Sequence, residues 1–364
     1  MSQSMMKNNL MDDLEYYNMA VDLEKHPEAW LYTIYSHRGP GKTYSTLRYM
    51  YENRIKIVYM KRTIEDVDIL CTDTGTDVEM DLSPYKPLNR DFGWNIQPVL
   101  IKKGLGGFYE SNEKGEPTGS PVAYVLAMSA ISKYKGFDLS DCDYIVFDEF
   151  IPPVGERLNR KEGDLLMELY MTVSRDRLKR GKPMLKLIML ANTSQISSPI
   201  TNSLELTDIM AEMEATGEAE TLFNGMYLHH LIEPKFQIIP PDDPVRKALG
   251  QTAWGQMAFD GKFSYNDFSN VRKQSIKGMQ PFIQLHYKTH DYFIYYREYD
   301  QSYYMCESRQ KCPLYYDLNR ENQQIKFYLD YQIDLKYACV DDRMKFQKYS
   351  MYDLIINYKN FCAT

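Results

Sequence analysis

The chain has 364 residues, of which 44% are hydrophobic and 26% are charged, and it carries a net charge of −7. This composition is typical of soluble globular proteins, and the length favours two domains or one large domain with an appendage. No apolar run approaches a membrane span in length, and the N-terminal residues lack the apolar core of a signal peptide, so we expect a cytoplasmic location. The acidic balance argues against a surface that coats nucleic acid but leaves room for a local basic patch.

The cysteines and histidines predict no metal centre. Six cysteines are scattered without a Cys-x-x-Cys pair, which indicates neither a zinc signature nor a disulfide framework. The six histidines are similarly dispersed. His286 and His290 are four residues apart, but they lie in a strand-like, Tyr-rich region where a helical metal-binding pair is not expected.

The first elements in the chain are a helix, a strand and a second helix. Apolar side chains share one helical face over residues 10–30, namely Leu10, Leu14, Tyr17 and Val21. An apolar, aromatic run at 30–35 predicts a strand, and residues 44–50 predict a helix. Between them lies a loop, residues 36–43, with the sequence Ser-His-Arg-Gly-Pro-Gly-Lys-Thr. A strand, a tight loop and a helix are the context that a phosphate-binding loop needs.

Loop 36–43 predicts a nucleotide site. Backbone N–H groups of a Gly-rich turn, with the positive end of the helix, hold phosphate oxygens. We expect Lys42 to reach the β- and γ-phosphates and the Thr43 hydroxyl to ligate Mg²⁺. The motif is imperfect, since Ser36 stands where the consensus has Gly, and a chance Gly-Lys-Thr is the alternative. The predicted nucleotide-binding residues of the loop are Ser36, Arg38, Gly39, Gly41, Lys42 and Thr43.

The following segments predict a parallel α/β sheet. Apolar runs typical of strands occur at 56–60, 144–150, 185–191 and 227–232. Residues 98–126 predict a β-hairpin-like insertion, and residues 165–178 predict a helix between two of the strands. The run at 144–150 is continuously apolar up to its last residues, which is the mark of a central strand buried on both faces.

Polar residues at the ends of two strands predict the catalytic part of the site. Asp148 is expected to hold Mg²⁺ directly or through water, and Glu149 to act as the general base that polarises the attacking water. The alternative is a solvated strand end. Asn192 and Thr193 end the neighbouring predicted strand, where a polar side chain can sense the γ-phosphate or the lytic water. A turn-forming Asn-Thr-Ser is the alternative there.

Two basic segments have more than one interpretation. The pair Lys61-Arg62 ends a predicted strand and faces either the ligand edge of the sheet or solvent. Residues 172–182 are the most basic stretch and include Arg175 and Arg177. An arginine finger for a neighbouring nucleotide, a DNA backbone contact and cations that complement a helix C-terminus all remain open.

The C-terminal third has a different pattern of predicted secondary structure. Residues 240–244 contain three prolines and mark a linker, so we predict a domain over 1–240, a linker subdomain over 241–272 and a smaller β-rich α+β domain over 273–364. Short aromatic strands are expected at 282–287, 292–296, 303–306 and 327–329, and a final helix at 341–357. The aspartates of this part form no convincing metal cluster: Asp291, Asp300, Asp317, Asp330 and Asp334.

Taken together, these motifs resemble one family, the DNA-packaging ATPases of small tailed phages, of the phi-29 type. They occur in the family's order and with similar spacing over about residues 30–265. The matching segments are 38–43, 145–151, 172–177, 190–192 and 254–257. The start of the loop with Ser36 also looks like that of the related large terminase ATPases.

The resemblance implies a fold and a role. It implies a P-loop ATPase of the ASCE type that depends on ATP and Mg²⁺. By this resemblance the protein forms a ring, a pentamer, at the portal vertex of an empty capsid in the host cytoplasm. The ring drives double-stranded DNA inward, with the portal protein and a packaging RNA as partners. Arg175 matches the family's trans-acting arginine, and Lys135, or equally Lys133, a lysine that acts across the subunit interface.

The resemblance also bears on the C-terminal domain, and two other functions remain open. Large terminases carry an RNase-H-like nuclease there, and phi-29-type proteins are expected to keep a reduced, inactive version. A different P-loop motor or helicase loader, acting on a protein or on single-stranded DNA, is one alternative. A nucleotide-binding scaffold without hydrolysis is the other, although Lys42, Asp148 and Glu149 argue against it.

Overall fold

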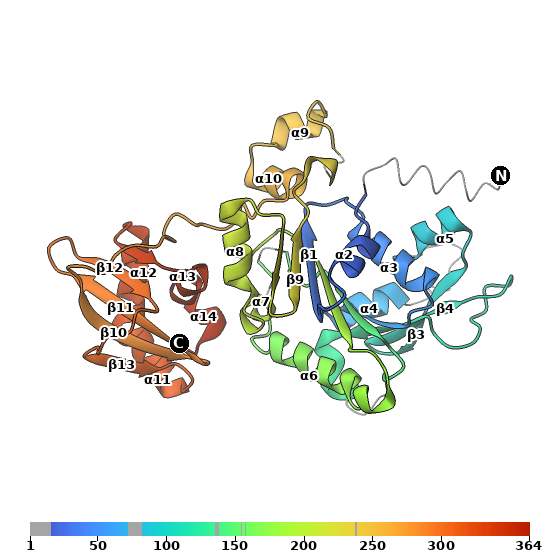
Figure 1. The fold of residues 1–364 in the computed structure, drawn as a ribbon, viewed down its shortest axis with the longest axis horizontal. Helices are drawn as coiled ribbons and strands as arrows, with labels where there is room; N and C mark the ends of the chain where they lie inside the picture. Colours follow the sequence, from blue (N-terminus) through green and yellow to red (C-terminus); the bar gives the residue numbers. More distant parts are fainter. Residues whose placement is uncertain (1–15, 72–81, 135–137, 154, 157, 237–238) are drawn as a thin grey trace. The chain divides into compact units, whose positions relative to one another are not determined.

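The computed structural model describes residues 16–71, 82–134, 138–153, 155–156, 158–236 and 239–364. The chain divides into two compact units. Unit 1 comprises residues 1–156, 164–195 and 213–265, and unit 2 comprises residues 157–163, 196–212 and 266–364. Figure 1 shows the ribbon of both units coloured along the sequence.

Unit 1 is built on a nine-stranded sheet with the order β3-β4-β5-β2-β6-β7-β1-β9-β8. The six strands from β5 to β9 in this order are parallel, whereas β3, β4 and β8 join antiparallel at the two edges. The strands are β1 (Leu31–Ser36), β2 (Ile57–Lys61), β3 (Ile96–Lys102), β4 (Leu105–Glu110), β5 (Ala123–Ala127), β6 (Tyr144–Asp148), β7 (Lys186–Asn192), β8 (Glu220–Phe223) and β9 (Met226–His230). The strands predicted at 30–35, 56–60, 144–150, 185–191 and 227–232 and the hairpin insertion are confirmed.

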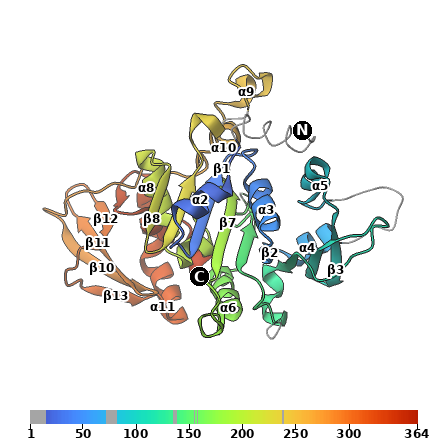
Figure 2. The same cartoon turned by 45° about the vertical axis from the view of Figure 1, so that its right-hand side comes forward.

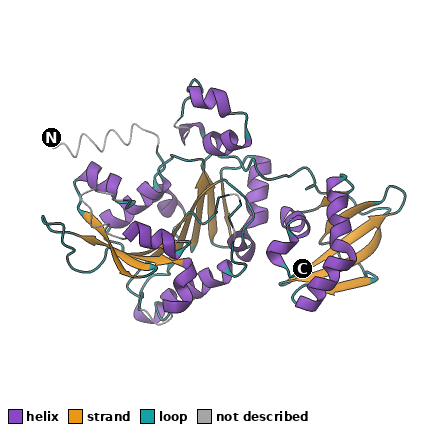
Figure 3. Ribbon diagram, turned by 180° about the vertical axis from the view of Figure 1, so that it is seen from behind, coloured by secondary structure: helices purple, strands orange, loops and turns teal. Residues whose placement is uncertain are grey.

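Helices lie around this sheet (Figure 3). They are α2 (Met19–Lys25), α3 (Lys42–Glu52), α4 (Ile64–Cys71), α5 (Lys86–Phe92), α9 (Pro244–Leu249) and α10 (Ala253–Asp260), with short helices η1 (Met128–Tyr134), η2 (Leu178–Arg180) and η3 (Pro234–Phe236). α6 (Glu162–Ser174) and α8 (Leu206–Thr216) contribute residues to both units, and α7 (Pro199–Ser203) belongs to unit 2. Within the described part of the predicted helix 10–30, α2 covers only Met19–Lys25, and Val21 is 55% exposed rather than on a buried face; Leu10 and Leu14 lie outside the described residues.

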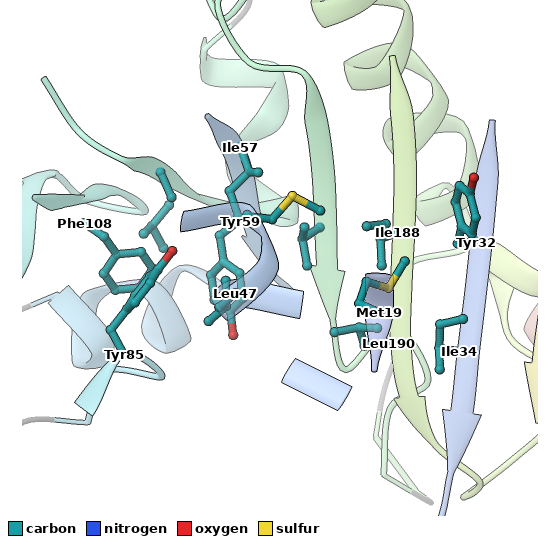
Figure 4. Packing of buried hydrophobic residues seen from close by; sticks show 14 of the residues in the cluster. Met19, Tyr32, Ile34, Leu47, Ile57, Tyr59, Tyr85, Phe108, Ile188 and Leu190 are labelled. Atoms are coloured by element: carbon teal, nitrogen blue, oxygen red, sulfur yellow. The ribbon is translucent and has the colours of Figure 1, made fainter. Parts of the chain in front are cut away.

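The core of unit 1 lies between one face of the sheet and helices α2, α3 and α4. Alternate strand residues point to this face because side chains of a strand alternate between its two sides. Figure 4 shows part of this cluster: Met19, Tyr32, Ile34, Leu47, Ile57, Tyr59, Tyr85, Phe108, Ile188 and Leu190. On the opposite face, the Tyr35 hydroxyl contacts Met213 Sδ of α8 at 3.3 Å. Burial on both faces explains why the central strands read as continuous apolar runs.

Unit 2 contains a five-stranded sheet with the order β13-β10-β11-β12-β14. Its strands are β10 (Gln280–Tyr287), β11 (His290–Arg297), β12 (Ser302–Cys306), β13 (Leu314–Asp317) and β14 (Met344–Phe346). Its helices are α11 (Glu321–Phe327), η4 (Tyr328–Gln332), α12 (Ile333–Val340), α13 (Tyr349–Ile356) and α14 (Tyr358–Phe361). The structure therefore has the predicted class, an α/β part with a parallel-rich sheet and a smaller β-rich part.

Two expectations for unit 2 are wrong. Residues 327–329 lie in the helical segment α11–η4 rather than in a strand, and the predicted helix 341–357 begins only at Tyr349, after strand β14. Aromatic residues favour strands as a class, but tertiary packing overrides this propensity. Here Phe327 is fully buried while Leu329 is 69% exposed, as expected for a helix with one face against the sheet.

Candidate nucleotide-binding site

The loop between β1 and α3 has the backbone of a tight anion-binding turn. Gly39 and Gly41 have φ angles of 107° and 84°, in the left-handed region that glycine adopts without strain. A Cβ atom at Gly41 would lie 3.3 Å from Cδ1 of Tyr16, so the loop is also closely packed there. α3 begins at Lys42, and its first N–H groups therefore point into this loop.

The Lys42 ammonium group lies inside the loop. Its Nζ donates hydrogen bonds to Ser36 Oγ at 2.5 Å and to the His37 carbonyl at 3.0 Å, and it approaches Asn192 Oδ1 at 3.4 Å. The residue is only 8% exposed. Burial lowers the pKa of Lys42 to about 7, although the Asp148 carboxylate opposes the shift. A phosphate anion bound in the loop would therefore stabilise the protonated form of Lys42.

The Asp148 carboxylate, at the end of β6, accepts hydrogen bonds from three side chains. Thr43 Oγ1 donates to Asp148 Oδ1 at 3.0 Å, and the Tyr59 hydroxyl donates to Oδ2 at 2.6 Å. Lys61 Nζ lies 3.2 Å from the same Oδ2 and 3.1 Å from Glu149 Oε2. Burial lowers the pKa of Lys61, but the two carboxylates outweigh it and the net shift is upward. An ammonium group thus already lies against the carboxylate that we expected to hold a metal ion.

Glu149 differs from Asp148 in exposure and in backbone conformation. Its side chain is 61% exposed, and its φ angle is 59°, which is a left-handed conformation that costs free energy for a residue with a Cβ. The following residue closes back onto the sheet, because the Phe150 amide donates to the Leu190 carbonyl at 3.1 Å. Arg62 supports this turn by donating to the Phe150 carbonyl at 2.6 Å. The Glu149 carboxylate is thus exposed next to the Lys61 ammonium at the end of β2.

Strand β7 lies between the loop strand β1 and the acidic strand β6. Ser36 is opposite Asn192 in register, and the Thr193 amide donates to the Ser36 carbonyl at 3.1 Å. The hydroxyl of Thr193 is buried and has no hydrogen-bond partner among the described residues. The loop, the acidic pair and Asn192 therefore meet at one edge of the sheet, where six parallel strands have their C-terminal ends.

The two arginines after α6 lie elsewhere. Arg177 is 2% exposed, and its guanidinium group donates to the Cys142 carbonyl and to Asp143 Oδ1, each at 2.6 Å. These partners directly precede β6, so they lie at the sheet edge opposite the loop. Arg177 is therefore a structural residue. Arg175 is exposed in the same turn and is not brought near the loop of its own chain.

The lysines considered for a contact across subunits have different positions. Lys133 is exposed in η1, which follows β5 at the same sheet edge as the loop. Lys135 lies outside the described residues.

Two further residues contribute to the site. The sequence leaves Lys61 and Arg62 open between the ligand edge and solvent, and in the structure Lys61 contacts both carboxylates. The sequence indicates Tyr59 only as part of a strand. The alternation within β2 offered a signal, since Tyr59 and Lys61 lie on the same face and Met60 on the other.

The arrangement fits a nucleotide with a hard divalent cation. The Thr43 hydroxyl and the Asp148 carboxylate are oxygen donors in contact, which is the ligand type that Mg²⁺ prefers. The Lys61 ammonium group forms an ion pair with Asp148, which shows that this carboxylate stabilises a positive charge. Chemically, the edge combines an anion-binding loop, a cation-binding pair and an exposed carboxylate that can accept a proton.

Comparison with solved structures shows a fold shared over nearly the whole chain. The Phi-28 gp11 DNA packaging motor aligns with a TM-score of 0.61 at 16% sequence identity, covering 96% of this chain and 98% of that chain. A chain of the bacteriophage Phi-29 viral genome packaging motor assembly aligns with a TM-score of 0.63 at 15% identity, covering 95% and 99%. The chain has the fold of these phi-29-type packaging-motor proteins. The resemblance inferred from the motifs is confirmed at the level of the fold.

Sequence comparison alone finds no relative. No family model matches the chain, and no curated protein sequence matches it. The fold is thus shared over 95–96% of the chain although most residues differ. Among the described residues, none of the helices is long and apolar enough to span a bilayer.

Proposed function

We propose that this chain is a Mg²⁺-dependent ATPase of the P-loop ASCE type that drives double-stranded DNA into a preformed viral capsid. The observation that carries the proposal is the contact between Thr43 and Asp148 beside a buried Lys42, at the C-terminal edge of a parallel sheet. The fold shared with two packaging motors over nearly the full chain supports the DNA-packaging role.

In this proposal each residue of the edge has a defined task. Lys42 and the amides of loop 36–43 bind the β- and γ-phosphates, and Thr43 with Asp148 holds Mg²⁺, which neutralises phosphate charge when bound. Glu149 accepts a proton from the water whose oxygen attacks the γ-phosphorus. The bond to the β–γ bridging oxygen breaks, and ADP and phosphate are the products. Asn192, whose Oδ1 lies 3.4 Å from Lys42 Nζ, senses the γ-phosphate in this proposal.

The same proposal explains an arginine far from its own loop. Arg175 is exposed in the same turn as Arg177, away from its own loop, and in this proposal it completes the nucleotide site of another copy. An arginine supplied in trans requires a head-to-tail interface, and such interfaces close into rings. We infer a homo-oligomeric ring at the capsid portal, a pentamer by resemblance, in the host cytoplasm. Lys133 or Lys135 would act across the same interface.

In this proposal the C-terminal part of the chain binds partners and does not cleave DNA. We propose that residues 273–364 form a reduced, non-catalytic RNase-H-like module for DNA, the portal protein or a packaging RNA. The aspartates considered above have local partners: Asp300 pairs with Arg297, Asp317 with Arg320, and Asp330 accepts from Tyr316. Within the described residues, they do not gather into a group of three metal ligands.

The test is the response of ATP hydrolysis to DNA. Double-stranded DNA should stimulate phosphate release by the full chain, and its binding should weaken steeply with salt because phosphate contacts release counterions. Lys42→Ala and Glu149→Gln should each abolish turnover, and Glu149→Gln should still bind ATP. Hydrolysis that ignores double-stranded DNA but responds to single-stranded DNA or to a protein partner would instead support a helicase loader or another motor. Absence of any phosphate release would contradict the enzyme itself.

A further inference from the structure

A second cluster of ionisable side chains lies in unit 1, at the β8 edge of the large sheet. β8 and β9 form an antiparallel pair in which Glu220 is opposite His229. Glu233 follows the end of β9 by a few residues, and α2 lies beside β8 (Figure 2), where Lys25 forms an ion pair with Glu220. The nucleotide edge uses none of these residues, so their arrangement needs its own explanation.

Three ligand atoms converge on one point in this cluster. His229 Nε2 lies 3.8 Å from Glu220 Oε1 and 3.7 Å from Glu233 Oε1, and the three ligand atoms are all within 4.8 Å of one another. The His229 side chain is only 6% exposed. These separations exceed the usual hydrogen-bond range, and among the described residues neither His229 Nε2 nor Glu233 Oε2 has a hydrogen-bond partner.

The other side of the imidazole ring is firmly held. His229 Nδ1 lies 2.9 Å from Asp22 Oδ2, and with the ring hydrogen on Nδ1 it donates to this carboxylate. Asp22 is itself fixed, because it accepts from the Tyr17 hydroxyl at 2.8 Å and from the Tyr227 hydroxyl at 3.3 Å. In this tautomer the lone pair of Nε2 points toward the two glutamates. A carboxylate behind a histidine is the arrangement that orients metal-ligating imidazoles.

We propose that Glu220, His229 and Glu233 form a binding site for one divalent transition-metal ion, with Zn²⁺ as the preferred ion. One nitrogen and two oxygen ligands, with water in the fourth position, make a normal tetrahedral zinc set. Bonds of about 2.0–2.1 Å at tetrahedral angles place ligand atoms roughly 3.3 Å apart. The two separations from His229 Nε2, 3.8 and 3.7 Å, therefore need only a small contraction, while the two glutamate oxygens lie within 4.8 Å of each other. The imidazole disfavours Mg²⁺ and Ca²⁺, which take oxygen ligands.

Neighbouring charges leave the required atoms available. Lys25 pairs with Oε2 of Glu220, so Oε1 stays directed toward His229. Lys235 approaches Glu233 Oε1 only at 3.7 Å and is itself half exposed. A bound ion would tie β8 and β9 to the segment that leaves the sheet after β9. Its effect should therefore be on the stability of this edge, independently of ATP hydrolysis.

A proton is the competing positive charge at this position. Burial lowers the pKa of His229, but the hydrogen bond to Asp22 and the surrounding Asp22, Glu233 and Glu220 carboxylates raise it to about 9. Zn²⁺ must displace this proton, and a titration with the metal itself distinguishes the two occupants.

The experiment is a Zn²⁺ titration of the full, chelator-treated chain, followed by calorimetry and by thermal unfolding. We expect binding of one ion and a rise in Tm, since an ion that binds only the folded chain stabilises it. Glu233→Gln keeps the size of a partly exposed side chain and removes the charge. It should weaken Zn²⁺ binding by at least about tenfold. Removal of a residue that only hydrogen-bonds to a metal ligand already lowers metal affinity by about this factor, and Glu233 is proposed as a ligand itself.

Two variants make the result specific. Glu218→Gln removes an exposed acid two residues before Glu220 and should leave Zn²⁺ affinity unchanged. Glu149→Gln should also leave it unchanged, because the nucleotide edge is a separate place. Unchanged affinity in a folded Glu233→Gln variant, loss of binding in Glu149→Gln, or no Zn²⁺ binding by the parent chain would each overturn the proposal.

Discussion

Thr43 Oγ1 donates a hydrogen bond to Asp148 Oδ1 at 3.0 Å, which joins the first turn of α3 to the end of β6 across 105 positions of the chain. The two residues come from different motifs, and the parallel sheet brings them together because both motifs follow strands that end at the same edge. The contact means that the proposed Mg²⁺ ligands are held in place by protein contacts. The Tyr59 hydroxyl and Lys61 hold the other oxygen of the same carboxylate.

Removal of the Tyr59 hydroxyl should weaken Mg²⁺ binding while leaving the fold intact. Tyr59→Phe deletes the 2.6 Å hydrogen bond to Asp148 Oδ2, so the carboxylate loses part of its orientation. We expect the Mg²⁺ concentration for half-maximal ATP hydrolysis to rise by about tenfold, within the range for partners of metal ligands. Tyr85→Phe is the matched control, because Tyr59 and Tyr85 both pack against the Phe108 ring. Equal Mg²⁺ dependence in both variants would contradict the orienting role.

Replacement of Glu149 by glycine should stabilise the protein and inactivate it. Glu149 has a φ angle of 59°, and glycine adopts this conformation without strain, so the free energy of unfolding should rise by about 1 kcal/mol. The lost ion pair with Lys61 contributes little because the glutamate side chain is 61% exposed. ATP hydrolysis should disappear with the general base. Denaturant unfolding and a phosphate-release assay measure the two effects.

The control for this prediction is a residue with similar backbone geometry in a hairpin turn. Gln301 has a φ angle of 51°, and Gln301→Gly should bring a comparable gain in stability without loss of hydrolysis. A Glu149→Gly variant less stable than the parent chain would show that the left-handed conformation is not a source of strain.

The buried Lys42 should make stability depend on pH. Burial lowers its pKa in the folded chain from the ordinary 10.5 to about 7, so between these values the unfolded chain binds more protons. Stability from this residue therefore rises with pH over that window and is lowest at or below pH 7. Without nucleotide, Lys42→Met should be more stable than the parent at pH 7, and this difference should shrink toward pH 9. Urea unfolding at pH 7, 8 and 9 measures it.

Lys56 supplies the comparison for the Lys42 experiment. Burial lowers the pKa of Lys56, but its hydrogen bond and ion pair with Asp141 outweigh this, and the net shift is upward. Both its folded and unfolded forms therefore stay charged up to pH 9. The difference between Lys56→Met and the parent should not change between pH 7 and 9. A constant difference for Lys42→Met as well would mean that the folded chain leaves the Lys42 pKa near its ordinary value.

The sheet could be predicted from sequence because its central strands obey one simple rule. Residues 145–147 of β6 are apolar without alternation, since helices cover both faces of the sheet. Unit 2 was harder. Phe327 and its aromatic neighbours favour strands by residue type, but only long-range packing decides that they form a helix.

Some residues of the candidate site could likewise be predicted from sequence, and others could not. Lys42, Thr43, Asp148 and Asn192 could be grouped in advance because each directly ends a parallel strand or starts the helix after one. Tyr59 could not, because a buried tyrosine in a strand looks like a core residue, and the alternation that puts it on the same face as Lys61 does not show which strand lies beside β2. Its hydroxyl reaches Asp148 only through the register of β2 against β6, in which Tyr59 is opposite Val146. Register is a property of the assembled sheet and leaves no local pattern.

Arg177 should be essential for stability. Its guanidinium group is buried against the Cys142 and Pro183 carbonyls and Asp143, and its removal leaves buried acceptors without a partner. Arg177→Ala should lower the free energy of unfolding by about 2 kcal/mol, mainly through the carbonyl acceptors left unpaired, since the Asp143 side chain is 38% exposed. Arg175→Ala is the internal control in the same turn and should change it by less than about 0.5 kcal/mol. Equal stability of the two variants would contradict the structural role of Arg177.

Arg175 should instead be essential for hydrolysis, and in a way that another copy can restore. The arginine is exposed at the sheet edge opposite Lys42, so in the proposed ring it completes the nucleotide site of a neighbour. Arg175→Ala and Lys42→Ala should each be inactive alone. In an equimolar mixture, a Lys42→Ala copy supplies Arg175 to an intact loop on an Arg175→Ala copy, so DNA-stimulated phosphate release should recover in part. The double variant mixed with Arg175→Ala lacks every arginine donor and should stay inactive. Recovery in that control, or no recovery in the first mixture, would exclude action across the interface.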